Sequence, residues 1–158
     1  MKKIQLTDTH KEKLFQIPLF RNLPLNIKES LLEKLDFVVY IANKKEIVVT
    51  QGTPCNKLYV LLEGKLRTDI IDGLGNEVMI EYIIAPRTFA TPHLFSSDNT
   101  LPATLTHRHY GNETSILFIV RYFIPIKYRY IYDGANREMS GYFEDCYSNA
   151  LAFYFYFS

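Results

Sequence analysis

The chain has 158 residues, a formal net charge of +1, 47% hydrophobic residues and 22% charged residues. This length is enough for one domain with a real hydrophobic core and a small appendage. These fractions of hydrophobic and charged residues are those of an ordinary globular protein. The net charge near zero excludes the strongly basic surface expected of a protein that binds DNA by itself.

The N-terminal residues 1–13 mix four lysines with acidic residues, which is typical of a solvated arm. They contain no apolar stretch of the kind that a secretion signal needs. The longest apolar run, residues 150–157, is too short to cross a bilayer as a helix. The two cysteines, Cys55 and Cys146, form no C-x-x-C motif, which favours reduced thiols. We therefore expect a cytoplasmic protein without a membrane segment.

A helical region is predicted from about Lys11 to Leu35. Its second half, from Asn26 to Leu35, has apolar residues at helical spacing on one face and charged residues on the other. These apolar residues are Ile27, Leu31, Leu32 and Leu35. Pro24 fits the start of this segment, because proline has no N–H group that would be left unpaired in the first turn.

Between Asp36 and Ile119 the pattern changes to short β-rich segments separated by turn residues. The first predicted strands are residues 37–41, 46–50, 58–62, 65–71 and 77–84. Residues 72–76 join the last two of these strands as a hairpin, since their glycines tolerate a positive φ.

The remainder of this β-rich region is less regular. Residues 86–99 are predicted to form a loop with one helical turn. Residues 103–110 and 114–119 are predicted to form a final strand pair around Gly111 and Asn112. Short strands with turns at regular intervals predict an antiparallel barrel or jelly roll.

After Val120 the composition shifts toward tyrosine and phenylalanine. Apolar residues then recur at steps of three and four, which predicts an amphipathic helix from about Asn136 almost to the end of the chain. Its apolar stripe consists of Met139, Tyr142, Phe143, Cys146, Tyr147, Ala150, Leu151 and Tyr154. Such a stripe must pack on the barrel or on a second copy of itself.

Five segments follow one another in a distinctive order, namely residues 17–24, 46–54, 58–66, 75–77 and 89–106. In turn they resemble the first helix, a glycine-ended strand, a Tyr-x-x-x-x-Gly strand, a turn and the phosphate-binding cassette of the Crp/Fnr transcriptional regulators. The resemblance covers roughly Leu14 to Ile119. It implies a mainly β fold, a double-stranded β-helix (jelly-roll) barrel of the cyclic-nucleotide-binding type with N-terminal and C-terminal helices. It also implies a cytoplasmic effector domain that is not an enzyme and holds no cofactor.

The resemblance divides the chain into an arm (residues 1–13), an effector domain (14–120) and a shortened dimerisation helix (121–158). In the family this helix leads into a winged helix-turn-helix that reads DNA, whereas this sequence stops at Ser158 without room for one. We therefore expect an effector-sensing unit truncated before the DNA-binding domain. Its expected partners are an unknown small molecule and, as a homodimer or heterodimer, a second copy or a full-length relative, without direct DNA binding and without a membrane.

Family members that bind a cyclic nucleotide hold the ribose hydroxyl with a glutamate and the phosphate with an arginine. At the cassette positions this chain has Phe89, Ala90, Thr91, Pro92, Ala103 and Thr104. Thr91 stands at the position of the glutamate and Ala103 at the position of the arginine. Because loss of a buried charge-assisted partner costs about 2–5 kcal/mol, we expect no binding of cyclic AMP in the usual way.

A rival interpretation uses the sequence His107-x-His109-x-x-x-Glu113, which resembles part of the first cupin motif. Two histidines at i and i+2 of a strand share one face, and the glutamate could join them on a divalent metal in an enzyme or small-molecule binder. The flanking glycines of the motif are absent and no histidine follows His109. We therefore expect rim histidines and no metal site. A haem ligand at His93, His107 or His109 is a third alternative.

Overall fold

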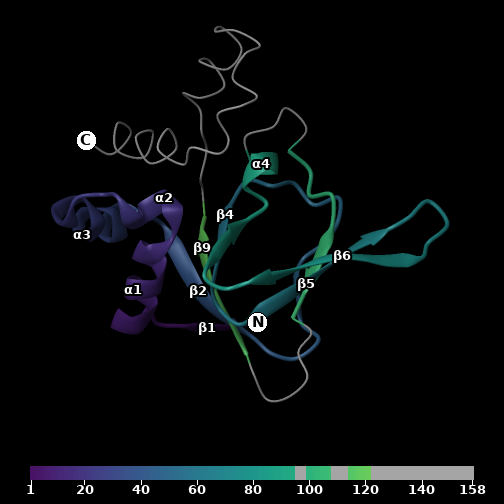
Figure 1. The fold of residues 1–158 in the computed structure, drawn as a ribbon, viewed down its shortest axis with the longest axis horizontal. Coiled ribbons are helices and arrows are strands. Elements are labelled where there is room, and N and C mark those ends of the chain that lie inside the picture. The colour runs from purple at the N-terminus through teal and green to yellow at the C-terminus, as the bar shows by residue number, and fades with distance from the viewer. Residues whose placement is uncertain (95–98, 108–113, 122–158) are drawn as a thin grey trace, which may run out of the picture.

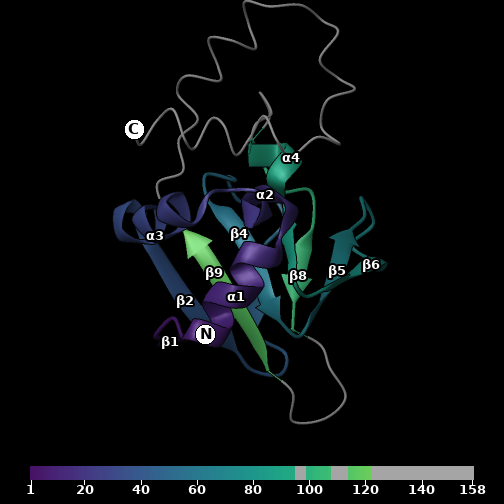
Figure 2. The same cartoon turned by 60° about the vertical axis from the view of Figure 1, so that its left-hand side comes forward.

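Two antiparallel sheets form the body of the computed structural model, which describes residues 1–94, 99–107 and 114–121 (Figures 1 and 2). The five-stranded sheet has the order β1 (Lys2–Ile4), β2 (Phe37–Ala42), β9 (Ser115–Val120), β4 (Leu58–Glu63) and β7 (Arg87–Phe89). The four-stranded sheet has the order β3 (Ile47–Val49), β8 (Thr104–Thr106), β5 (Lys65–Ile71) and β6 (Glu77–Ile84). Within the described residues no strand pair joins the two sheets, so hydrogen bonds do not close the barrel.

Four helices accompany the sheets in the described residues: α1 (Asp8–Gln16), α2 (Pro18–Arg21), α3 (Leu25–Lys34) and α4 (Thr91–Leu94). The helices α1 to α3 lie on one side of the molecule, and the β5–β6 hairpin extends from the opposite side (Figure 1). The predicted helical region is confirmed as three helices, and the segment after Pro24 is α3. Pro18 and Pro24 mark the breaks, since proline suits the start of a helix and not its interior.

The N-terminal residues 1–13, expected as a solvated arm, are largely exposed and carry secondary structure that was not predicted before residue 11. Residues 2–4 form β1, which pairs with β2, and Asp8 begins α1. Thr7 caps this helix, because its hydroxyl oxygen accepts the His10 N–H while the Thr7 N–H is accepted by His10 Nδ1. The lysines of this segment therefore lie on structured elements.

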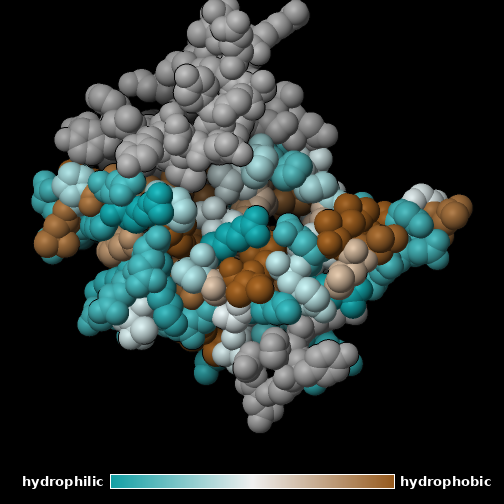
Figure 3. Space-filling model, viewed as in Figure 1, coloured by the Kyte–Doolittle hydropathy of each residue, from teal (hydrophilic) through white to brown (hydrophobic). Residues whose placement is uncertain are grey.

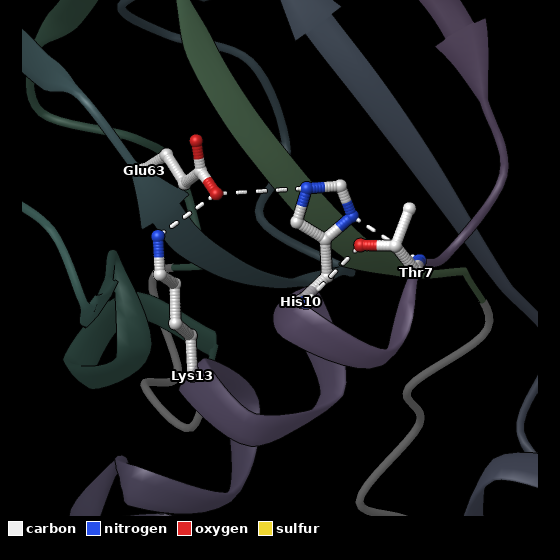
Figure 4. Close-up of polar contacts among 4 residues, drawn as sticks. All are labelled: Thr7, His10, Lys13 and Glu63. Carbon is white, nitrogen blue, oxygen red and sulfur yellow. Dashed lines mark hydrogen bonds and ion pairs between the residues drawn. The ribbon is translucent and has the colours of Figure 1, made fainter.

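A polar contact ties α1 to the end of β4 (Figure 4). Lys13 Nζ lies 2.8 Å from Glu63 Oε1, and His10 Nε2 lies 3.7 Å from the same oxygen. The carboxylate is about one-third exposed, so the contact orients the helix more than it stabilises the fold.

The strand predictions between residues 37 and 84 are confirmed to within two residues at each end. Two later predictions are wrong. The region 86–99 contains a strand, β7, in addition to the predicted helical turn of α4. The two last strands, β8 and β9, do not pair with each other, because β8 lies between β3 and β5 while β9 lies between β2 and β4. The turn residues Gly111 and Asn112 lie outside the described residues.

The core lies between the sheets and under the helices. The central strand β9 has six buried residues in succession, Ser115 through Val120. Phe118 stacks on Phe37 of β2 with ring centroids 4.7 Å apart, and Phe20 of α2 is almost completely buried. A strand covered on both faces has no polar alternation, which explains the apolar run that follows Ser115 in β9.

Candidate ligand-binding site

The first half of the cassette is the connection from β7 to α4. Phe89 ends β7, and its ring stacks on Tyr59 of β4 with centroids 5.3 Å apart. Burial raises the pKa of Tyr59 to about 12. Both rings are buried, so they anchor the connection to the five-stranded sheet.

Ala90 has a φ of +59°, a left-handed backbone conformation that favours glycine. The strain of a non-glycine residue there is about 1–2 kcal/mol. Hydrogen bonds hold Ala90 in this conformation, because its carbonyl accepts the N–H groups of His93 at 3.1 Å and Leu94 at 3.3 Å. The Cys55 thiol donates to the same carbonyl at 3.5 Å.

Thr91 carries a buried hydroxyl oxygen that has no hydrogen-bond partner among the described residues. A buried polar atom without a partner calls for a physical explanation, and a ligand is one. Pro92 follows, and it has no N–H group to offer an anion at the start of α4. The site thus presents a hydroxyl where the family resemblance implies a carboxylate.

The second half of the cassette leads into β8. The Ala103 side chain is only 6% exposed. The Thr104 hydroxyl oxygen accepts the backbone N–H of Gln51 at 3.0 Å. A small buried apolar side chain therefore occupies the position expected for the arginine. The Thr104 hydroxyl, which was expected to contact a ligand, is already hydrogen-bonded within the protein.

The loop of residues 51–55 joins the two halves of the cassette. The Gly52 N–H donates to the Leu101 carbonyl at 2.8 Å, and the Leu101 N–H donates to the Thr53 carbonyl at 2.9 Å. Cys55 donates its backbone N–H to the Asn99 carbonyl and its thiol to Ala90. Sequence reasoning missed Gln51 and Cys55, because a loop after a glycine gives no sign of its tertiary contacts.

The local charge does not suit a phosphate. None of the six cassette residues is cationic. Thr104 is paired across the β5–β8 ladder with Asp69, which is 3% exposed and bound by Arg67 at 2.6 Å. Because Arg67 is already engaged by a buried carboxylate, its charge is partly neutralised.

The expectation of rim histidines is wrong for His107. This side chain is 0% exposed, and its Nδ1 lies 2.6 Å from Ser115 Oγ. The other two residues of the cupin-like motif, His109 and Glu113, lie outside the described residues. The described part of the chain holds no group of three histidine, cysteine or acidic residues that could bind a metal.

The predicted dimer-helix stripe also lies outside the described residues, so its eight apolar residues stay a prediction from sequence. Those residues are Met139, Tyr142, Phe143, Cys146, Tyr147, Ala150, Leu151 and Tyr154. In the part that the structure describes, no helix is both long and apolar enough to cross a membrane.

The cassette lies in a region of the chain that matches a known protein family. Residues 42–112 match the family model of the cyclic nucleotide-binding domain. The fold is that of the cyclic nucleotide-binding domain. The predicted jelly roll of this type is thereby confirmed, and all of the cassette positions lie inside the matched residues. No curated protein sequence matches the chain.

Several solved structures are similar in shape to this chain at low sequence identity. A candidate cyclic nucleotide-binding protein from Ruegeria pomeroyi DSS-3 has a TM-score of 0.62 and 13% identity, over 94% of this chain and 57% of that one. The regulatory domain of Toxoplasma gondii PKA, crystallised with cAMP, has a TM-score of 0.58 and 15% identity, over 73% and 41%. The sensor domain of the transcriptional regulator DNR from Pseudomonas aeruginosa has a TM-score of 0.58 and 22% identity, over 77% of each chain. The chain thus spans only 57% and 41% of the first two proteins.

Proposed function

We propose that this cyclic nucleotide-binding domain is the effector-sensing unit of a Crp/Fnr-type regulator and that its ligand is a small molecule other than cyclic AMP. Its role is regulatory rather than catalytic, and it acts in the cytoplasm. The similarity to the DNR sensor domain supports the regulatory part of the proposal. The composition of the cassette supports the ligand part.

Two side chains of the cassette carry the ligand proposal. Ala103 is buried at the position where the resemblance implies the phosphate-binding arginine. Thr91, at the position of the ribose-binding glutamate, has a buried hydroxyl without a partner in the described residues. A ligand that accepts or donates a hydrogen bond at Thr91 and carries no anion at Ala103 fits these two side chains.

The test is thermal unfolding of the full chain with cyclic AMP. We expect no shift for the natural sequence. The variant Thr91→Glu/Ala103→Arg restores both charged groups, and cyclic AMP at about 100 times its Kd would then stabilise the fold by about 2.7 kcal/mol. The variant Thr91→Gln/Ala103→Met is the control, because it adds similar bulk without charge. A clear shift for the natural sequence would contradict the proposal.

For the output we propose that residues 121–158 pair this unit with a second copy or with a full-length relative and do not bind DNA. The apolar stripe predicted from Met139 to Tyr154 supports pairing. Light scattering after size exclusion at micromolar concentration measures the assembly, and a strict monomer would count against it.

A further inference from the structure

The inner face of the β5–β6 hairpin carries a buried hydroxyl group that has no hydrogen-bond partner in the described residues. This group belongs to Thr68 of β5, whose side chain is 8% exposed. Its neighbours on the same face, Leu66 of β5 and Leu105 of β8, are buried in the core between the sheets. A buried polar atom without a partner calls for a physical explanation, and Thr68 lies outside the cassette.

Glu81 of β6 lies directly opposite Thr68 on this inner face. The two residues are partners in the β5–β6 ladder, so their Cβ atoms are about 4.5–5.5 Å apart. The bulge of the ladder lies beyond this pair, between Thr68 and Asp69, and Glu81 therefore shares the face of the buried Ile83. The Glu81 side chain is half exposed, so its carboxylate can turn toward Thr68.

Arg87 of β7 reaches the same place from the other sheet. Phe37 lines a groove with residues of α1 and α3, which marks the helix side of the five-stranded sheet, and Leu58 shares that side through the β2–β9–β4 register. Leu61 has the opposite phase from Leu58 along β4, so Arg87, the partner of Leu61, faces the four-stranded sheet. Arg87 Nη1 lies 3.8 Å from Glu81 Oε2.

This ion pair spans two terminal strands. β6 ends the four-stranded sheet, β7 ends the five-stranded sheet, and the described residues show no ladder between them. At 3.8 Å the two groups attract each other without a hydrogen bond, and Arg87 is 58% and Glu81 50% exposed. Each group therefore keeps donors or acceptors for a ligand. The pair has no net charge, which suits a ligand with one charge of each sign better than a phosphate, since Glu81 would repel an anion.

Apolar residues continue the inner face toward the tip of the hairpin. Ile70 and Val78 are ladder partners one step beyond the bulge, in which Ile80 is the extra residue that returns Val78 to the inner face. Val78 is 47% exposed. Figure 3 shows hydrophobic surface along this hairpin. The inner face thus offers two opposite charges, a free hydroxyl group and an apolar surface in succession.

We propose that the ligand of this sensor unit is an α-amino acid with an apolar side chain. Its carboxylate takes the place of Glu81 on Arg87, and its ammonium group donates to the Glu81 carboxylate and to the Thr68 hydroxyl oxygen. Its side chain lies against Ile70 and Val78. An amino acid carries its two charges on one carbon atom, as the neighbouring Glu81 and Arg87 require. This inference rests on the proposed function, because it names the class of the ligand that replaces cyclic AMP.

Isothermal titration calorimetry of the full chain with L-leucine, L-valine and L-phenylalanine tests the ligand class. We expect saturable binding of at least one of them. The amine and the carboxylic acid that correspond to the tightest binder each lack one charged group; for L-leucine they are isoamylamine and 4-methylpentanoate. Each should bind at least about tenfold more weakly than the amino acid.

Variants of the three polar residues test the location. Glu81→Gln and Arg87→Gln should each raise the Kd of the amino acid at least about tenfold. Thr68→Val should also raise it, whereas Thr68→Ser, which keeps the hydroxyl group, should not. The control Asp8→Asn/Lys11→Gln removes another exposed ion pair, on α1, and should leave the Kd unchanged. Melting temperatures without ligand show whether each variant is folded.

The outcomes separate this inference from the proposed function. If neither the three amino acids nor cyclic AMP bind, only this inference is overturned. If cyclic AMP binds the natural sequence, the proposed function and this inference are both overturned. Equal affinity for the amino acid and for its amine or acid would overturn the inference. An unchanged Kd in folded Glu81→Gln and Arg87→Gln variants would overturn it as well, because the amino acid would then bind elsewhere.

Discussion

The Nδ1 atom of His107 lies 2.6 Å from the hydroxyl oxygen of Ser115, and both side chains are fully buried. His107 follows β8 in one sheet, and Ser115 begins β9 in the other. The Ser115 hydroxyl donates to the Lys65 carbonyl at 3.3 Å, so it accepts the proton that His107 carries on Nδ1. This contact connects two sheets that are not joined by a strand pair within the described residues.

Removal of this contact should destabilise the fold. For His107→Ala we expect a loss of about 2–4 kcal/mol in the free energy of unfolding, since a large buried side chain and its hydrogen bond disappear. Ser115→Ala should cost about 1–3 kcal/mol, because the imidazole N–H loses its acceptor. Urea unfolding measures both. His93→Ala, on the partly exposed surface of α4, is the matched control and should change little.

Gly64 should tolerate no side chain. It has a φ of +85°, and a Cβ atom there would lie 2.6 Å from Ser115 Oγ and 2.7 Å from the Thr114 carbonyl oxygen. Gly64→Ala should therefore cost clearly more than the backbone strain of about 1–2 kcal/mol. Gly75→Ala isolates that strain, because Gly75 has a φ of +86° with no atom within 4 Å of the added Cβ. Equal losses in urea unfolding would show that the close approach to Ser115 has no energetic effect.

Relief of the strain at Ala90 should stabilise the protein. Glycine adopts the φ of +59° at this position with little strain, but it loses more backbone entropy on folding than alanine does. The net effect of Ala90→Gly should be a rise of about 0.5–1 kcal/mol in the free energy of unfolding. Ala90→Val should have the opposite sign, since a β-branched residue fits this conformation poorly. Thermal unfolding of the pair checks the prediction, and a destabilised glycine variant would argue against strain at this residue.

The Cys55 thiol should react slowly. Burial raises its pKa above the ordinary value, and the Lys57 N–H lowers it by less. A raised thiol pKa means less thiolate at any given pH, and the thiolate is the reactive form. In a Cys146→Ser background Cys55 is the one remaining thiol. Iodoacetamide should modify it much more slowly in the folded chain than in urea at pH 8. Equal rates would contradict its burial against Ala90.

The hairpin of β5 and β6 follows directly from local sequence. Residues 65–71 and 77–84 are strands as predicted, and the turn between them is made by its own side chains. Asp72 Oδ1 accepts the N–H groups of Leu74 and Asn76, each at 2.8 Å. Such contacts span a few residues, so a local pattern is sufficient to predict them.

The residue types of the cassette could be predicted from the sequence, whereas its three-dimensional geometry could not. The absence of an arginine at Ala103 and of a glutamate at Thr91 can be read from the sequence beside the family resemblance. The left-handed backbone of Ala90 and the bonds from Gln51 and Cys55 cannot, because they depend on segments about 35 to 53 residues apart meeting in space.

By itself, the sequence determined the strands and turns between residues 37 and 84, because alternation, glycine and proline act through neighbouring residues. Only the tertiary structure decided which strands pair. It separated β8 from β9, recruited Lys2–Ile4 as β1 and buried His107 between the sheets. Pairing between distant strands depends on which apolar faces can be buried together, and that choice is made by the whole core rather than by any one segment.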